Sequence, residues 1–383
     1  MLDVPPVKLR CTEYRMLKIA CPNCSSVSAG TAPSGVFGPV CYGPDVKAAT
    51  VLLAVRGHMS VVRAAQMMHA LLDAQVSTGF ASGLIRRLAT ELTPFMTALK
   101  ARLKSAPVLH LDETPASVSG DEMRQFETEA LLRGEHLAPD RRQPGPDWMY
   151  VHVARAGPLI WLGAHKRRSH EATDSFNILT GYEGVLVTDR LALYDKYAKT
   201  AAGRQICCAH ILRDLTGVIE GEPGVDHSWA LAAQDTLRDF HRSVEQAKAT
   251  GANRLDAPRE AELHRRWRHA YLVGLAQNAG RRTSQNKRHP AWVAAEMLKN
   301  RTDEILLFTS DFDVEWTNNP AERALRMVKL QMAVSGCWRR VESADWYCTV
   351  RSYLDTARAH GIDLLDALRN AFTGTPWIPP ATT

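Results

Sequence analysis

Five apolar runs of strand length, all between residues 107 and 212, constrain the fold more than any other feature of the chain. The first three follow one another: PVLHLDETPASV (107–118), DWMYVHVAR (147–155) and PLIWLGAHK (158–166). The last two, GVLVTDR (184–190) and RQICCAHIL (204–212), alternate with helix-like segments. Consecutive strands followed by alternating helices and strands are typical of a mixed α/β sheet covered by helices. We therefore predict that fold class.

Helical patterns flank this region. Upstream, SVVRAAQMMHALL begins at Ser60, a predicted N-cap, and STGFASGLIRRLATELTPFMTALKARL begins at Ser77. Two helices joined this closely indicate either a DNA-reading helix-turn-helix or an ordinary helical hairpin, and the sequence leaves both open. Downstream, residues 214–302 have no strand signal and are predicted to be a helical basic insertion. The predicted segments are therefore 1–43, 44–104, 105–213, 214–302 and 303–383.

Positive charge is concentrated in two segments. Residues 261–290 hold seven Lys or Arg and one acid, and residues 323–340 hold five Lys or Arg and no acid, although the formal net charge of the chain is only +6. This distribution favours a polyanionic partner such as DNA, but composition alone leaves a solvated helix face equally open. The side chains considered for phosphate binding are Arg213, Arg281, Arg282, Lys287, Arg288, Arg323, Arg326 and Lys329.

Three acids lie where separate elements could bring them together. Asp112 lies on the first predicted strand and Asp189 ends the fourth, so both can reach one edge of the sheet. Glu322 occupies the third position of a helix that is predicted to start with Asn319 as N-cap and Pro320 at the first helical position. From this local sequence alone, a capping-box role for Glu322 is favoured.

Acids that converge from separate elements repel one another unless a cation lies between them. Mg²⁺ suits such a site because it takes oxygen ligands, and two such ions can assist an in-line phosphoryl displacement. Acids and basic segments together predict a nucleic-acid phosphodiester as substrate. On a strand, Glu113 points to the opposite face from Asp112, so we predict a supporting or structural role for it.

Five longer blocks carry a family resemblance. Over residues 10–378, and in the same order, they resemble the successive blocks of the bacterial insertion-sequence-66 family of transposases: LHLDETPASV, LVTDRLALYDKY, CCAHILRDL, TNNPAERALRMVKLQMAVSGCWRR and RSYLDTARAHGIDLLDALRNAF. The Asn-Asn-Pro-Ala-Glu-Arg block, followed by Ser-Gly-Cys-x-Arg, is the most specific of these motifs.

The resemblance implies a ribonuclease-H-like catalytic core with a helical insertion before its glutamate. It also implies cleavage and joining of double-stranded DNA at transposon ends, and assembly of a homo-oligomer on that DNA. Carried over by position, Asp112, Asp189 and Glu322 bind Mg²⁺ or Mn²⁺, which reverses the capping preference for Glu322. His210 lies in a family block and could orient a metal-site group; a buried histidine bonded to a backbone carbonyl is the alternative.

Only Cys21 and Cys24, among eight cysteines, have metal-ligand spacing. A structural zinc site needs four ligands, and Cys11 and Cys41 are the nearest candidates to complete one. A turn with two free thiols is therefore favoured over Zn²⁺. Members of the family usually extend further upstream with a second Cys-x-x-Cys half, so residues 1–43 are expected to be a shortened module.

Two functions follow from these features. One is an active transposase, favoured by the three intact acids; the other is a truncated or domesticated remnant that binds DNA without transposing. No apolar run approaches the ~20 residues that a membrane span needs, and the start lacks the apolar core of a signal peptide. We therefore expect a cytoplasmic, nucleoid-associated protein with no membrane partner.

Overall fold

A five-stranded mixed sheet forms the centre of the computed structural model, which describes residues 2–3, 7–33, 35, 36, 38, 40–120 and 148–380. Its strand order is β5-β4-β3-β6-β7. Neighbouring strands are antiparallel from β3 through β4 to β5 and parallel from β3 through β6 to β7. The strands are β3 (Val108–Ser117), β4 (Trp148–Ala156), β5 (Leu159–His165), β6 (Val185–Thr188) and β7 (Gly203–Ile206). The predicted mixed α/β class is confirmed.

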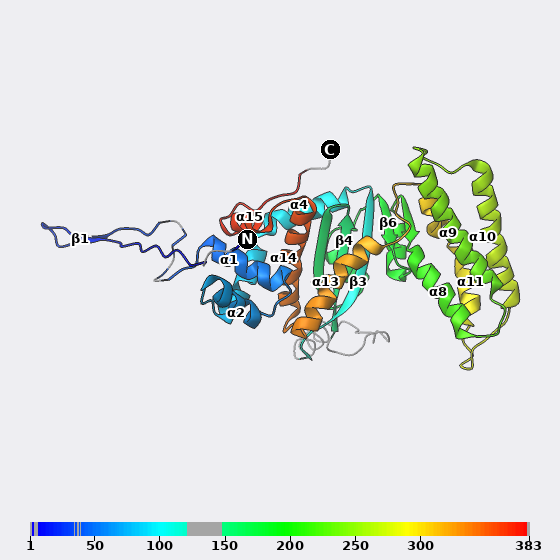
Figure 1. Ribbon diagram of the computed structural model, residues 1–383, viewed down its shortest axis with the longest axis horizontal. Coiled ribbons are helices and arrows are strands. Elements are labelled where there is room, and N and C mark those ends of the chain that lie inside the picture. Colours follow the sequence, from blue (N-terminus) through cyan, green and yellow to red (C-terminus); the bar gives the residue numbers. More distant parts are fainter. Residues whose placement is uncertain are drawn as a thin grey trace.

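The N-terminal part consists of a short hairpin followed by helices. In Figure 1 the hairpin extends away from the rest of the molecule, and the helices after it pack beside the sheet. The elements are β1 (Lys18–Ala20), β2 (Val27–Ala29), α1 (Pro44–Val51), a π-helix (Leu52–Arg56), α2 (Val61–Leu72), α3 (Thr78–Glu91) and α4 (Thr93–Lys104).

Helix starts in this part follow from side-chain caps. The Ser60 hydroxyl accepts a hydrogen bond from the backbone N–H of Arg63, which confirms the predicted N-cap, and the Ser77 hydroxyl does the same for Phe80. The run from Ser77 was expected to continue without a break, but α3 ends at Glu91 and α4 begins at Thr93. Pro94 explains the break, because proline is tolerated in the first turn of a helix and not in its interior.

Helices also follow the sheet, as predicted for residues 214–302. Figure 1 shows α8 to α11 grouped beside β6, at the far side of the sheet from α1 and α2. The helices between β5 and the C-terminal helices are α6 (His170–Ser175), a 3-10 helix (Ala192–Tyr194), α7 (Asp195–Ala198), α8 (Cys208–Gly221), α9 (Ser228–Ala249), α10 (Ala257–Gln277), α11 (Pro290–Asn300), α12 (Thr302–Ile305) and a second 3-10 helix (Leu307–Thr309). The chain then forms α13 (Asn319–Ser335), α14 (Val341–Ala359) and α15 (Leu364–Phe372).

Two of the predicted strands differ from the observed ones. The run RQICCAHIL was expected to be a strand throughout, but β7 ends at Ile206 and α8 begins at Cys208. Its buried residues Cys208, Ile211 and Leu215 recur at helical spacing, which explains the helix. The first predicted strand contains Pro115, and proline usually ends a strand, yet β3 continues to Ser117. Parallel pairing with β6 stops at residue 110, so Pro115 lies where β3 is an edge strand and tolerates a missing N–H.

Two hydrophobic clusters hold these elements together. The first joins β3, β4 and β5 to α3, α4, α13, α14 and α15. The second joins β6 and β7 to the helices of the insertion, with Trp229 and Trp267 among its buried side chains. Strand β6 contributes to both, since Leu186 packs in the first cluster and Val187 in the second. Among the helices of the described ranges, none is both long and apolar enough to span a membrane.

Candidate active site

Asp112 and Asp189 are brought together by the register of two parallel strands. Asp112 lies on β3, and Asp189 directly follows β6. The register pairs His110 with Val187, so the two acids stand two residues further along neighbouring strands and share one face of the sheet. The sequence-based expectation that both acids reach one edge of the sheet therefore has a direct structural basis.

The other acids of the region affect the pKa of Asp112. Burial raises the pKa of Asp112 to about 7, and the negative charges of Glu113, Asp189 and Glu322 contribute to the increase. Like charges raise a carboxyl pKa in this way only when they lie close by. In the described ranges, the carboxylate oxygens of Asp112, Asp189 and Glu322 do not lie as close together as the ligating atoms of Cys207, His210 and Glu322.

Glu322 is placed by the first turn of α13. The N-cap position is Asn318 rather than the predicted Asn319, and no side chain caps the helix. Pro320 is therefore the second helical residue, and the backbone N–H of Glu322 donates to the carbonyl of Asn318 at 3.1 Å. The Glu322 carboxylate lies 3.8 Å from His210 Nδ1. The capping-box role that local sequence favoured is not what the structure shows.

Asn318 fixes the start of α13 against β3. Its side-chain amide donates to the carbonyl of Leu111 at 2.7 Å, and its carbonyl oxygen lies 3.2 Å from His110 Nδ1. Because that oxygen can only accept, His110 must carry its proton on Nδ1. Burial lowers the pKa of His110 to about 4, so the ring is neutral. The sequence reasoning missed this residue; the doubled asparagine before Pro320 was the available signal.

Glu113 supports the opposite side of β3. Its carboxylate accepts a hydrogen bond from the Tyr194 hydroxyl at 2.6 Å and lies 3.5 Å from Arg168 Nη1. Its backbone N–H donates to Asp112 Oδ1 at 2.9 Å. Burial raises the pKa of Glu113 to about 7, against the lowering effect of the Tyr194 hydrogen bond. These contacts hold the Glu113 side chain beside Tyr194 and Arg168, and its supporting or structural role stays a prediction.

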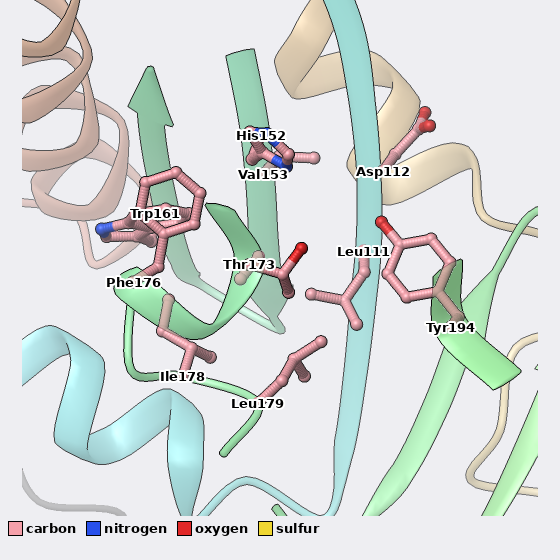
Figure 2. A pocket seen from close by; sticks show the side chains of 11 residues that line it. Leu111, Asp112, His152, Val153, Trp161, Thr173, Phe176, Ile178, Leu179 and Tyr194 are labelled. Carbon is pink, nitrogen blue, oxygen red and sulfur yellow. The ribbon is translucent and has the colours of Figure 1, made fainter. Parts of the chain in front are cut away.

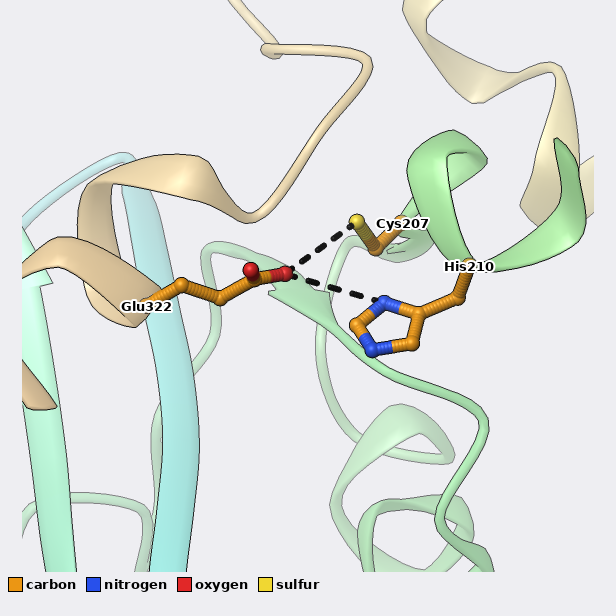
Figure 3. Close-up of side chains that lie close together, drawn as sticks. All are labelled: Cys207, His210 and Glu322. Atoms are coloured by element: carbon orange, nitrogen blue, oxygen red, sulfur yellow. Dashed lines mark hydrogen bonds and ion pairs between the residues drawn. The ribbon is translucent and has the colours of Figure 1, made fainter. Parts of the chain in front are cut away.

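His210 and Cys207 face the Glu322 carboxylate from the start of α8. Figure 3 shows the three side chains converging, with His210 Nδ1 3.8 Å and Cys207 Sγ 4.0 Å from Glu322 Oε1. His210 Nδ1 is buried and has no hydrogen-bond partner, so the backbone-carbonyl alternative for this nitrogen is not observed. Burial lowers the pKa of His210 and raises that of Cys207.

The predicted DNA-binding side chains fall into two groups. Arg323, Arg326 and Lys329 are exposed at three-residue spacing along α13, so they share one face of that helix. Arg213 is largely exposed, and its Nη2 lies 3.8 Å from Glu322 Oε1. Arg213 thus adjoins Glu322, and the other three side chains lie on the helix that carries Glu322.

The remaining four lie in the loop between α10 and α11, and acids neutralise two of them. Arg281 pairs with Glu222 at 2.6 Å, and Arg288 pairs with Glu296 at 2.6 Å. Arg282 and Lys287 are exposed and form no ion pair with a residue in the described part of the chain. The positive charge of this loop is thus smaller than the sequence suggested.

Cys21 and Cys24 stand at the turn of the β1–β2 hairpin. The Cys24 thiol lies 3.0 Å from the Ser26 hydroxyl, which lowers the pKa of Cys24. All four N-terminal cysteines have free thiols. Within the ranges that the structure describes, neither Cys11 nor Cys41 joins them in a group of three metal-ligating atoms. In the described ranges, Cys21 and Cys24 thus supply two of the four ligands that a structural zinc site needs.

A small cavity of about 20 Å³ lies close to Asp112 but on the apolar side of the sheet. In Figure 2 the side chains of Leu111 and Asp112 leave β3 in opposite directions, and Trp161, Phe176 and Ile178 line the cavity. It has room for roughly one water molecule. The cavity is therefore too small to hold a segment of a polymer.

Acids near one end of a mixed sheet, beside exposed basic side chains, are the arrangement expected of a protein that acts on nucleic acids. The chain belongs to the transposase IS66 family, whose family model matches residues 39–345. The match covers most of the chain, and it confirms the family that the sequence blocks indicated. A search of curated proteins found no match.

Proposed function

We propose that this transposase cuts and joins DNA at the ends of an insertion sequence, in a divalent-metal-dependent phosphodiester transfer at Asp112, Asp189 and Glu322. The observation that carries the proposal is the β3–β6 register, which places two acids side by side, with Glu322 close enough to raise the pKa of Asp112. Three antiparallel strands followed by two parallel ones also support a ribonuclease-H-like core.

The donor set fits a hard divalent cation. The side chains that would hold Mg²⁺ or Mn²⁺ are those of Asp112, Asp189 and Glu322, all of which offer oxygen ligands. Burial is the main cause of the raised pKa of Asp112, and the negative charges of Asp189 and Glu322 add to it; a cation between the three carboxylates would relieve that repulsion. When bound, such a metal would supply activation of the attacking oxygen and stabilisation of the leaving oxygen of a phosphodiester. Glu113 would hold Asp112 in place through its N–H.

The basic side chains near the acids suggest the path of the DNA. Arg213 and the exposed face of α13 flank Glu322, and guanidinium groups bind phosphate oxygens in bidentate fashion. We assign residues 105–213 and 303–383 to the catalytic core, 214–302 to an insertion that extends the contact, and 44–104 to a second DNA-binding region. A homo-oligomer assembled on DNA completes the proposal.

The purified protein should nick and join DNA only when a divalent metal is present. We expect cleavage of DNA carrying the element's ends in Mg²⁺ or Mn²⁺, complete loss after chelation with EDTA, and recovery when the metal is returned. Binding of the same DNA, measured by electrophoretic mobility shift, should survive chelation. Metal-independent cleavage would contradict the proposal, and DNA binding without cleavage in any metal would instead favour the remnant.

The exposed loop charges should contribute to binding through counterion release. Replacing Arg282 and Lys287 with alanine removes the two unpaired charges, so the slope of log affinity against log salt should become shallower by about two units. The matched control is Arg238→Ala with Lys248→Ala, since both of these side chains form ion pairs on α9 of the same insertion. Equal slopes for the two double variants would show that the loop does not contact DNA.

A further inference from the structure

Cys207, His210 and Glu322 form the most compact group of metal-ligating side chains in the described ranges. Their ligating atoms all lie within 4.8 Å of one another. The three residues come from two different elements, because Cys207 and His210 flank the first turn of α8 and Glu322 lies on α13. This group includes a thiol and an imidazole, which the proposed magnesium site does not require.

The backbone around Cys207 is arranged as it would be around a thiolate ligand. The N–H of Asn318 donates a hydrogen bond to Cys207 Sγ at 3.1 Å. Amide groups at the start of a helix stabilise negative charge on sulfur. A cation can therefore displace the thiol proton to solvent without leaving the sulfur charge uncompensated.

The distances suit a tetrahedral cation after a small closure. With bonds of ~2.3 Å to sulfur and ~2.1 Å to nitrogen or oxygen, tetrahedral ligands lie about 3.6 Å (S to O) and 3.4 Å (N to O) apart. The observed separations from Glu322 Oε1 are 4.0 Å to Cys207 Sγ and 3.8 Å to His210 Nδ1. A shift of the glutamate carboxylate by a few tenths of an ångström would close both distances. Cys207 Sγ and His210 Nδ1 lie within 4.8 Å of each other, and they must also approach to about 3.6 Å. The buried, unpartnered His210 Nδ1 is aimed at this position.

We propose that Cys207, His210 and Glu322 bind a borderline-soft divalent cation of the Zn²⁺ class, with a fourth coordination position left open. Thiolate and imidazole ligands select such cations, whereas Mg²⁺ requires oxygen ligands in octahedral geometry. The Arg213 guanidinium, 3.8 Å from Glu322, is largely exposed and can move away when the cation binds.

Occupation of this site has a consequence that rests on the proposed function. The carboxylate of Glu322 belongs both to the acid set and to the Cys-His-Glu set, so it cannot serve both cations fully at once. A bound soft cation therefore withdraws Glu322 from magnesium. The cation acts as an inhibitor of strand cleavage, and its effect depends on Cys207.

Cobalt(II) absorption tests the binding directly and does not depend on cleavage activity. The full chain would carry Cys21→Ser and Cys24→Ser, which remove the Cys-x-x-Cys pair of the N-terminal hairpin. We expect one Co²⁺ per chain with a thiolate-to-cobalt charge-transfer band that Zn²⁺ displaces. Cys207→Ser should abolish the band and weaken Co²⁺ binding at least about tenfold. Cys337→Ser, at an exposed thiol, is the matched control and should change neither.

A missing band at saturating Co²⁺, or a band that survives Cys207→Ser, would overturn the site. Circular dichroism and thermal melting show whether the serine variant is folded. His210→Asn is a second variant, and it should also lower the affinity for Co²⁺ if the site exists. In a cleavage assay with Mg²⁺, inhibition by Zn²⁺ should require at least about tenfold more zinc in Cys207→Ser. Binding without inhibition would refute the competition alone, whereas absent cleavage in all variants would count against the proposed function and not against the site.

Discussion

Replacing Asp112 or Asp189 with asparagine, or Glu322 with glutamine, is expected to lower DNA cleavage in Mg²⁺ or Mn²⁺ by about a thousandfold or more. Each substitution preserves shape and volume but removes one carboxylate from the acid set. Asp112 and Asp189 share one face of neighbouring strands, and Glu322 completes the set from α13, so no other described acid can replace a lost one at the same position. The measurement is single-turnover strand cleavage of labelled DNA.

The same three variants should fold and bind DNA. Because Asp112, Asp189 and Glu322 repel one another, Asp112→Asn should leave the free energy of unfolding in metal-free buffer unchanged or increased. Glu183→Gln, an exposed carboxylate just before β6, is the control and should retain full activity. Near-normal cleavage in any one of the three variants would remove that residue from the site.

Replacing Asn318 with alanine is expected to reduce both stability and activity. The substitution leaves the carbonyl of Leu111 and His110 Nδ1 buried without their partner, which should cost about 2–4 kcal/mol of unfolding free energy. It also loosens the start of α13 relative to β3, so we expect cleavage to fall by about 10- to 100-fold. Denaturant unfolding and single-turnover cleavage measure the two effects.

Asn319→Ala is the natural comparison for this prediction. Asn319 has the same chemistry one residue later, but it is partly exposed and forms no side-chain hydrogen bond within the described structure. Its substitution should change the unfolding free energy by about 0.5 kcal/mol or less. If the two alanine variants behave alike, Asn318 does not position the helix.

The sequence predicted those features of the fold that depend on residues close together in the chain. Alternating and continuous apolar runs predicted the strands, because period-two burial depends only on neighbouring residues. The cap at Ser60 was predictable for the same reason, since its hydrogen bond joins residues three apart. Both aspartates were expected at the sheet edge because parallel strands end there together.

The features that sequence missed depend on contacts between distant segments. The Asn318 side chain forms hydrogen bonds to Leu111 and His110 on β3. These residues lie 207 and 208 positions earlier in the sequence, so no local pattern reveals the contacts. The change from strand to helix at Cys207 was missed because a short apolar run satisfies both periods. Ion pairs between distant residues were missed as well. Arg281 pairs with Glu222, 59 residues away, and this neutralises part of the positive charge counted in residues 261–290.

The two hydrophobic clusters give the candidate site an unusual dependence on the rest of the fold. The helix that carries Glu322 packs through Ala321 and Leu325 in the first cluster, while His210 comes from a helix anchored by Ile211 in the second. The residues that face one another in the site are thus held by separate packing units. Formation of the site is therefore thermodynamically coupled to the docking of those two units. A core substitution in the insertion that weakens this docking is expected to lower activity, although the substituted residue makes no contact with the site.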